Sequence, residues 1–144
     1  MAQVADRKHG IAGPTTTSTV RSEDWDGRDL SGERHEKVAF IDVDLSEAVD
    51  DGGVFTECAF RGARFNVSRH ANAAFVNCTF TRCSFFDATF AGCTFGLLEV
   101  DGGDWSFTDL SAFDPETAEL KGAVIDPAQA LVIAAALGLV VRED

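Results

Sequence analysis

Phenylalanine recurs at every fifth residue through the middle of the chain. In the segment AAFVNCTFTRCSFFDATFAGCTF, residues 73–95, it stands at every position divisible by five. Between residues 25 and 125, 17 of the 21 positions divisible by five hold a large apolar residue, so one register runs through a hundred residues. A strand alternates with period 2 and a helix with period 3.6, and neither produces this spacing. A repeated unit of five residues is therefore the strongest constraint on the fold.

The other positions of the unit also keep a constant character. A small residue stands two places before the large one, as at Ala73, Cys78 and Ala88, and glycine often stands two places after it. Glycine at a fixed place in the unit is typical of a corner, where the backbone φ angle becomes positive. We expect the large and small residues to point inward and the polar residues to point outward.

This pattern resembles the pentapeptide-repeat family, and the matching units include CAFRGARF, CTFTRCSFFDATFAGCTF and TDLSA. The resemblance implies an all-β solenoid, a right-handed quadrilateral β-helix with one unit on each face and about 20 residues in each coil. Residues 23–125 would form about five such coils, each residue lying over the residue one coil further along. Residues 1–22 are expected to be a partly disordered N-terminal tail with a short start to the first coil, and residues 126–144 a C-terminal unit for capping and dimerisation.

Asp50 and His70 occupy interior positions where a large apolar residue is expected, and they lie one coil apart. An acid and an imidazole stacked in one column could form a buried structural pair, which would offset much of their desolvation. A catalytic Asp–His dyad is a second interpretation, although a solenoid filled with side chains leaves no room for a substrate. A third is that the VDDGG segment, residues 49–53, bulges outward and turns Asp50 to solvent.

No motif in the sequence indicates a metal, another cofactor or an enzymatic activity. The cysteines all stand at the small inward position and lack the short paired spacing of a zinc site, so we expect buried free thiols. The chain has no apolar run long enough to cross a membrane and no apolar N-terminal leader, which predicts a cytoplasmic protein. The four cysteines are Cys58, Cys78, Cys83 and Cys93.

The C-terminal unit begins with helix-start signals. Asp126 is a predicted N-cap, Pro127 occupies the first helical position, and Gln129 completes a capping box. The helix is expected to end before Gly138, with a short strand over residues 139–141. Because it is apolar on every side, it should be buried, either in a symmetric homodimer or folded over the last coil of a monomer. The predicted dimer interface consists of Leu131, Ile133, Leu137, Leu139 and Val141.

Charge is distributed unevenly along the chain, whose formal net charge is −12. This charge argues against direct binding to nucleic acid and favours either a basic partner or a solvated surface that only keeps the protein soluble. Residues 58–86 contain no acid, so a weakly basic belt is expected between two acidic regions. The belt consists of Arg61, Arg64, Arg69 and Arg82.

A repeat that is capped by an apolar C-terminal helix resembles the quinolone-resistance subgroup of the family, whose members are acidic rods that imitate DNA and bind DNA gyrase. The resemblance implies a non-catalytic DNA mimic that modulates gyrase or another topoisomerase and protects it from quinolones or toxins. The alternative is a protein-interaction scaffold without DNA mimicry, for which the arginine belt is the distinguishing feature. The acids assigned to the partner surface are Asp101, Asp104, Asp109, Asp114, Glu116 and Glu119.

Overall fold

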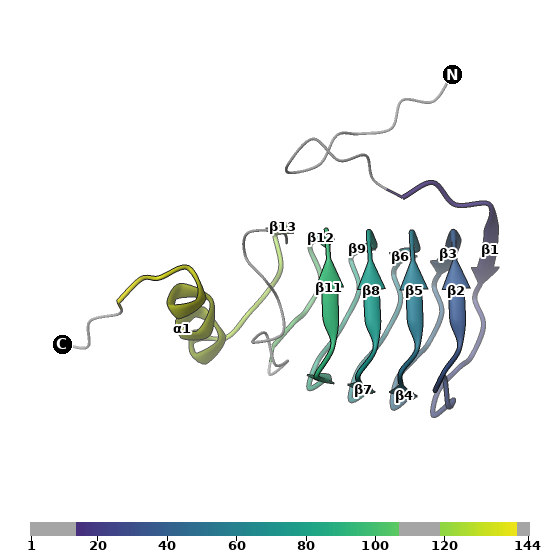
Figure 1. Ribbon diagram of the computed structural model, residues 1–144, viewed down its shortest axis with the longest axis horizontal. Coiled ribbons are helices and arrows are strands. Elements are labelled where there is room, and N and C mark those ends of the chain that lie inside the picture. The colour runs from purple at the N-terminus through teal and green to yellow at the C-terminus, as the bar shows by residue number, and fades with distance from the viewer. Residues whose placement is uncertain (1–13, 107–118, 141–144) are drawn as a thin grey trace, which may run out of the picture.

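A computed structural model describes residues 14–106 and 119–140 of the chain. The strands stack in successive coils, and a single helix stands beyond the last of them (Figure 1). Every strand pair among the described residues is parallel and joins residues twenty positions apart, as Phe40 pairs with Phe60 and Phe55 with Phe75. The predicted stacking of one coil over the next is therefore confirmed.

Three parallel sheets and one row of isolated bridges form the sides of the solenoid. The first sheet has the order β1 (Ser18–Arg21), β3 (Val38–Ile41), β6 (Ala59–Arg61), β9 (Thr79–Thr81), β12 (Glu99–Asp101), β13 (Glu119–Lys121). The second has the order β2 (Arg34–Glu36), β5 (Val54–Thr56), β8 (Ala74–Val76), β11 (Thr94–Gly96). The third has the order β4 (Val49–Asp51), β7 (Arg69–Ala71), β10 (Thr89–Ala91). The bridges on the remaining side run from Asp24–Asp44 to Asp104–Val124.

The first coil begins within residues 1–22, where a tail followed by a short start to the first coil is expected. β1 lies near the end of this segment, and its residues pair with β3 from Ser18 onward. The continuous stretch 14–106 holds about four turns of roughly twenty residues, against the five expected for residues 23–125. β13 and Val124 continue the register one turn further, while residues 107–118 lie outside the described part of the chain.

Stacked aromatic rings fill the interior and explain the spacing of phenylalanine. The rings of Phe40, Phe60 and Phe80 form one column, with centroids 4.8 and 4.7 Å apart and planes within 9° of parallel. Rings of neighbouring columns meet edge to face, as Phe60 and Phe65 do. Flat rings stack at the spacing between coils, and burying each one stabilises the fold by about 1.5–3 kcal/mol.

The corners of the coil impose a left-handed backbone on whatever residue occupies them. From residue 22 to residue 102, every position ending in 2 or 7 has a positive φ angle. Glycine adopts this conformation without strain, but Val67 has a φ of 60° and Leu97 a φ of 55°. The glycine pattern thus predicts where the corners lie, although many corners hold another residue because the four-sided path requires a turn there.

The C-terminal helix α1 (Pro127–Ala136) begins as predicted. Gln129 N–H donates to Asp126 Oδ1 at 3.0 Å, and Asp126 N–H donates to Gln129 Oε1 at 2.7 Å, which completes the capping box. The strand predicted over 139–141 is not formed at Leu139 and Val140, and Val141 lies outside the described residues. Among the described residues no strand follows the helix, so Leu139 and Val140 have none beyond it to pair with. No helix in residues 14–106 or 119–140 is long and apolar enough to cross a membrane.

Candidate functional site

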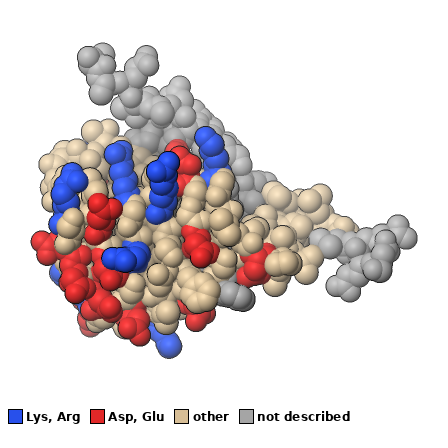
Figure 2. Space-filling view, turned by 180° about the vertical axis from the view of Figure 1, so that it is seen from behind, with Lys and Arg blue, Asp and Glu red and all other residues tan. Residues whose placement is uncertain are grey.

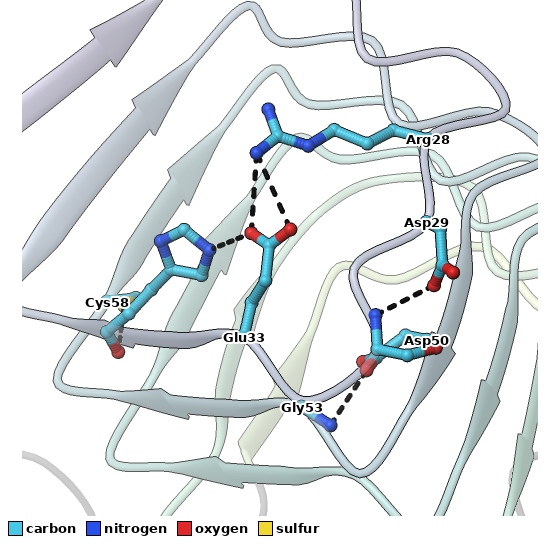
Figure 3. A network of polar contacts seen from close by, with 8 residues as sticks. Arg28, Asp29, Glu33, Asp50, Gly53 and Cys58 are labelled. Carbon is cyan, nitrogen blue, oxygen red and sulfur yellow. Dashed lines mark hydrogen bonds and ion pairs between the residues drawn. The ribbon is translucent and has the colours of Figure 1, made fainter.

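A chain of hydrogen bonds runs through the interior where Asp50 and His70 replace the apolar core. Gly53 N–H donates to Asp50 Oδ1 at 2.8 Å, as Figure 3 shows. Asp50 Oδ2 lies 3.1 Å from His70 Nδ1, and His70 Nε2 lies 3.1 Å from Ser68 Oγ. Asp50, Ser68 and His70 are each at most 1% exposed. Asp50 therefore faces inward, and the VDDGG segment does not turn it to solvent.

The register of the coils brings this chain of residues together. Asp50 in β4 pairs directly with His70 in β7. Gly53 stands where the repeat places a small side chain, and a Cβ there would collide with the Asp50 carboxylate. His70 stacks on Phe90 with ring centroids 5.0 Å apart and planes 9° from parallel, so the imidazole takes the place of a phenylalanine in its column.

The order Ser68–His70–Asp50 is that of a hydrolytic triad, but the serine has no contact with solvent. Ser68 is 0% exposed, and the imidazole beside it lies against the rings of Phe75 and Phe90. A nucleophile must touch its substrate, so this arrangement fits a structural role, in which each polar group satisfies its neighbour. With neutral His70, Nδ1–H donates to Asp50 and the Ser68 hydroxyl donates to Nε2.

The repeat places Ser68 at the small inward position and predicts no polar role for it. The available clue was its polarity, two residues before His70, at a position that holds alanine or cysteine in every other unit from Cys58 to Cys93. Side chains two positions apart on a strand point to the same side, so a serine there can reach the imidazole. A polar residue at a small position next to a polar residue at a large position is the pattern that predicts such a network.

A second polar network covers the N-terminal end of the aromatic stack (Figure 3). Glu33 accepts hydrogen bonds from Arg28 Nη2 at 3.4 Å and lies 2.9 Å from His35 Nε2. His35 stacks on Phe55 at 5.2 Å, and its side chain is 19% exposed. Arg28 also lies over the Trp25 ring, 3.9 Å from its centroid. Glu33 thus contacts the polar edge of His35, and the Arg28 guanidinium lies over the face of Trp25.

Only some of the acids assigned to the partner surface lie within the described residues. Asp101 and Asp104 are exposed on the last continuous coil, and only the backbone of Glu119 is described, in β13. The other acids of this set, Asp109, Asp114 and Glu116, lie outside the described residues. A further acidic group lies at the opposite end of the solenoid from α1. There the carboxylate oxygens of Asp24, Asp26 and Asp44 lie within 4.8 Å of one another.

The four arginines of the belt are all exposed, but they do not form one patch. Arg61 ends β6 on the first sheet, Arg64 lies on the bridged side between Asp44 and Ser84, and Arg69 begins β7 on the third sheet. Arg82 follows β9, one coil beyond Arg61. The belt therefore runs around the solenoid, and only Arg61 and Arg82 share a corner.

Helix α1 contacts the solenoid through one narrow side. The Gln129 side-chain amide donates to the Trp105 carbonyl, and Ile133 packs against the aromatic core. Ile133 was assigned to the dimer interface from sequence, but it lies four residues after Gln129 and so shares its solenoid-facing side. The residues on the remaining surface are exposed: Leu131 by 44%, Leu137 by 54% and Leu139 by 61%.

The twenty-residue register and the four sides of each coil identify the fold as a four-sided β-solenoid. Sequence comparison found no matching family model and no matching curated protein. Structural comparison matches the chain to pentapeptide-repeat proteins. One is the pentapeptide repeat protein Rfr23 from the cyanobacterium Cyanothece 51142, with 12% identity and a TM-score of 0.39 over 78% of this chain and 85% of that one. Another is full-length QnrB1, a plasmid-mediated fluoroquinolone resistance protein, with 14% identity and a TM-score of 0.33 over 88% of this chain and 100% of that one.

Proposed function

We propose that the protein is a non-catalytic binding module that acts as a cytoplasmic homodimer and modulates DNA gyrase or another topoisomerase. In this proposal its acidic surface occupies the basic groove that normally receives DNA. The observation that carries the proposal is the position of Asp104. Its exposed carboxylate immediately precedes Trp105, whose carbonyl oxygen anchors Gln129 of α1. Exposed negative charge therefore lies next to the point where α1 joins the solenoid.

A second copy of the chain is the proposed cover of that helix. Leu131 and Leu137 are about half exposed, and burying a leucine contributes about 1.5–3 kcal/mol. A symmetric dimer buries the same surface twice, once from each copy. A two-fold axis at α1 also places Asp101 and Asp104 of both copies on either side of the seam, which doubles the negative surface offered to a partner.

Local hydrogen bonds support an acidic surface that stays ionised. Bonds from the Ser46 hydroxyl and backbone N–H hold the pKa of Asp44 below its ordinary value. The same two kinds of bond from Ser31 lower the pKa of Asp29. Ionised carboxylates on a chain of net charge −12 attract a basic groove over a distance and set the orientation of binding. DNA gyrase is the candidate because the repeat and its apolar ending resemble the quinolone-resistance subgroup.

Inhibition of purified gyrase tests this proposal. We expect the protein to inhibit DNA supercoiling, and the inhibition to weaken as salt rises from 50 to about 300 mM, because exposed charges are screened over about 10 Å or less. The variant D101K/D104K should lose most of the inhibition. The control E36K/D51K makes the same change in net charge at exposed positions of other sheets and should retain it. Equal loss in both variants would mean that net charge alone matters, and no inhibition at any salt would remove gyrase as the partner.

The scaffold function without DNA mimicry is a second candidate, because basic side chains interrupt the acidic surface. A uniform mimic of DNA has no use for exposed cations, and Arg61 and Arg82 share a corner on successive coils. These residues point to a separate contact with an anionic partner.

A further inference from the structure

A row of basic side chains runs along one corner of the solenoid, as Figure 2 shows. Three of them end strands of the first sheet and are connected through its register, and the fourth directly follows β9. All are exposed. We call this set the basic row, and it consists of Arg21, Arg61, Arg82 and Lys121.

The basic row makes no ion pair with the described part of the chain. The Lys and Arg ion pairs within residues 14–106 and 119–140 join Arg28 to Glu33 and Lys37 to Glu57, and the carboxylates of Glu33 and Asp50 also contact His35 and His70. On a chain whose net charge is −12, intramolecular partners are abundant. An aligned set of cations that none of these carboxylates neutralises is available to a charged group from another molecule.

Glycines beside the basic row leave part of its floor open, whereas the Asp42 carboxylate occupies the space over Gly62. Three corners of this column hold glycine, at Gly62, Gly102 and Gly122, and each of these glycines has a positive φ angle. Gly122 lies directly over Gly102, and the Arg82 side-chain stem passes close to Gly102. With no side chains at these corners, an extended chain can approach the backbone and reach the guanidinium groups from the side.

The order of charges along the corner favours a polypeptide partner over a nucleic acid. Asp42 interrupts the basic row on the second coil and Asp101 on the fifth. A nucleic acid carries negative charge at a uniform spacing, so it would meet both carboxylates and the net negative charge of the chain. A polypeptide can place a neutral or basic residue opposite each carboxylate, and Arg binds carboxylates in a bidentate geometry.

We propose that the basic row binds an acidic, extended segment of a partner protein. Five steps between coils at about 4.8 Å give the row a length of about 24 Å, which an extended segment of about seven residues spans. Same-side residues of such a segment lie about 6.7 Å apart, which lets carboxylates reach cations on neighbouring coils. The basic row and the acidic surface meet at Asp101, which pairs with Lys121. The proposal nevertheless does not require gyrase binding, because it uses the opposite charge and its test changes only Arg61 and Arg82.

A labelled peptide tests the proposal directly. The probe is a fluorescein-labelled decapeptide of alternating Glu and Thr, which places its carboxylates on one side when extended, and binding is followed by fluorescence anisotropy. We expect binding that weakens with salt and that falls at least tenfold in R61E/R82E. The matched control R64E/R69E changes the same charge on other sides of the solenoid and should bind within twofold of the unchanged protein. Circular dichroism checks folding, and R61Q/R82Q replaces the reversal variant if that variant is unfolded.

Three results would overturn the proposal. One is no binding of the peptide by the unchanged protein at millimolar concentration. Another is an equal loss of affinity in R61E/R82E and R64E/R69E, which would mean that the basic row has no special part. The third is tighter binding of a ten-residue oligothymidylate than of the peptide with the same dependence on Arg61 and Arg82, which would assign the row to nucleic acid. Failure of gyrase inhibition leaves these outcomes unchanged.

Discussion

His70 Nδ1 lies 3.1 Å from Asp50 Oδ2 although the two residues are a full coil apart in the sequence and neither is more than 1% exposed. Each belongs to a column otherwise filled by apolar side chains, between Leu30 and Phe90. Removing water from a carboxylate costs several kcal/mol unless the lost contacts are replaced. Here Gly53 N–H and the imidazole replace them, and Ser68 satisfies the other ring nitrogen.

Breaking this pair from one side is expected to destabilise the fold. In H70F the ring stack continues, but the Asp50 carboxylate remains buried without its imidazole, which should lower the free energy of unfolding by about 3–5 kcal/mol. In D50L/H70F both polar groups are gone, and most of that loss should be recovered. Urea unfolding followed by circular dichroism measures both. An H70F variant as stable as the unchanged protein would show that the pair does not hold the carboxylate.

The buried Ser68 is expected not to react with reagents that label nucleophilic serines. Ser68 has the geometry of a nucleophile beside an imidazole, but it is 0% exposed, so a fluorophosphonate reagent cannot reach it in the folded protein. Intact-mass spectrometry after incubation should therefore show no adduct. An adduct that disappears in S68A would contradict the structural role and would place a reactive site inside the solenoid.

Relieving backbone strain at one corner should stabilise the protein. Val67 has a φ of 60°, which costs a β-branched residue about 1–2 kcal/mol, whereas Asn72 and Asn77 occupy equivalent corners with a residue that tolerates it. We expect V67N to raise the free energy of unfolding by about 1 kcal/mol in urea denaturation. Val76 is similarly exposed but has no positive φ, so V76N serves as the control and should bring no gain.

The cysteines should react in order of their accessibility. Burial raises the pKa of the Cys83 thiol to about 12, so at pH 8 it is protonated as well as inaccessible. Burial also raises the pKa of Cys93, but this residue is only half-buried. Iodoacetamide at pH 8, with peptide mapping, should therefore modify Cys93 first and Cys83 only after urea is added. Modification of Cys83 before Cys93 would mean that the interior opens near the last coils.

Placing charge on the exposed side of α1 should separate the proposed dimer. We expect the unchanged protein to have about twice the mass of one chain in sedimentation equilibrium, because one α1 covers another. L131D/L137D should sediment as a monomer, since carboxylates would be buried in the interface. Val76 is 39% exposed in β8, away from the helix, so V76D controls for added surface charge and should stay dimeric. A monomeric unchanged protein would contradict the homodimer.

Most of the fold can be predicted from the sequence because a solenoid repeats one local unit. The positions of Phe40, Phe60 and Phe80 predict both the column and the coil length, and Asp126 with Gln129 predicts the helix start. The beginning of the repeat at Ser18 is less visible, since β1 is a mostly exposed strand whose residues need not be apolar. Edge strands meet water on one side, which weakens the pattern.

The candidate site is less predictable because it depends on which side of the coil each residue faces. Arg61, Arg64 and Arg69 are close in sequence, yet the path of the chain places them on three different sides. Ser68 is small and therefore fits the repeat, so its place in the sequence does not predict a polar contact. Its hydrogen bond to His70 is recognised only from the structure. Ile133 is one apolar residue among many in α1, so sequence alone does not show that it faces the solenoid.

Competition between the protein and DNA for gyrase is the most direct test of the proposed mimicry. Fluorescently labelled protein is titrated with purified gyrase, and a linear DNA fragment is then added as competitor. DNA mimicry predicts that the protein binds, that DNA displaces it, and that D101K/D104K binds at least tenfold more weakly. Binding that DNA does not displace, or no binding at low salt, would contradict DNA mimicry.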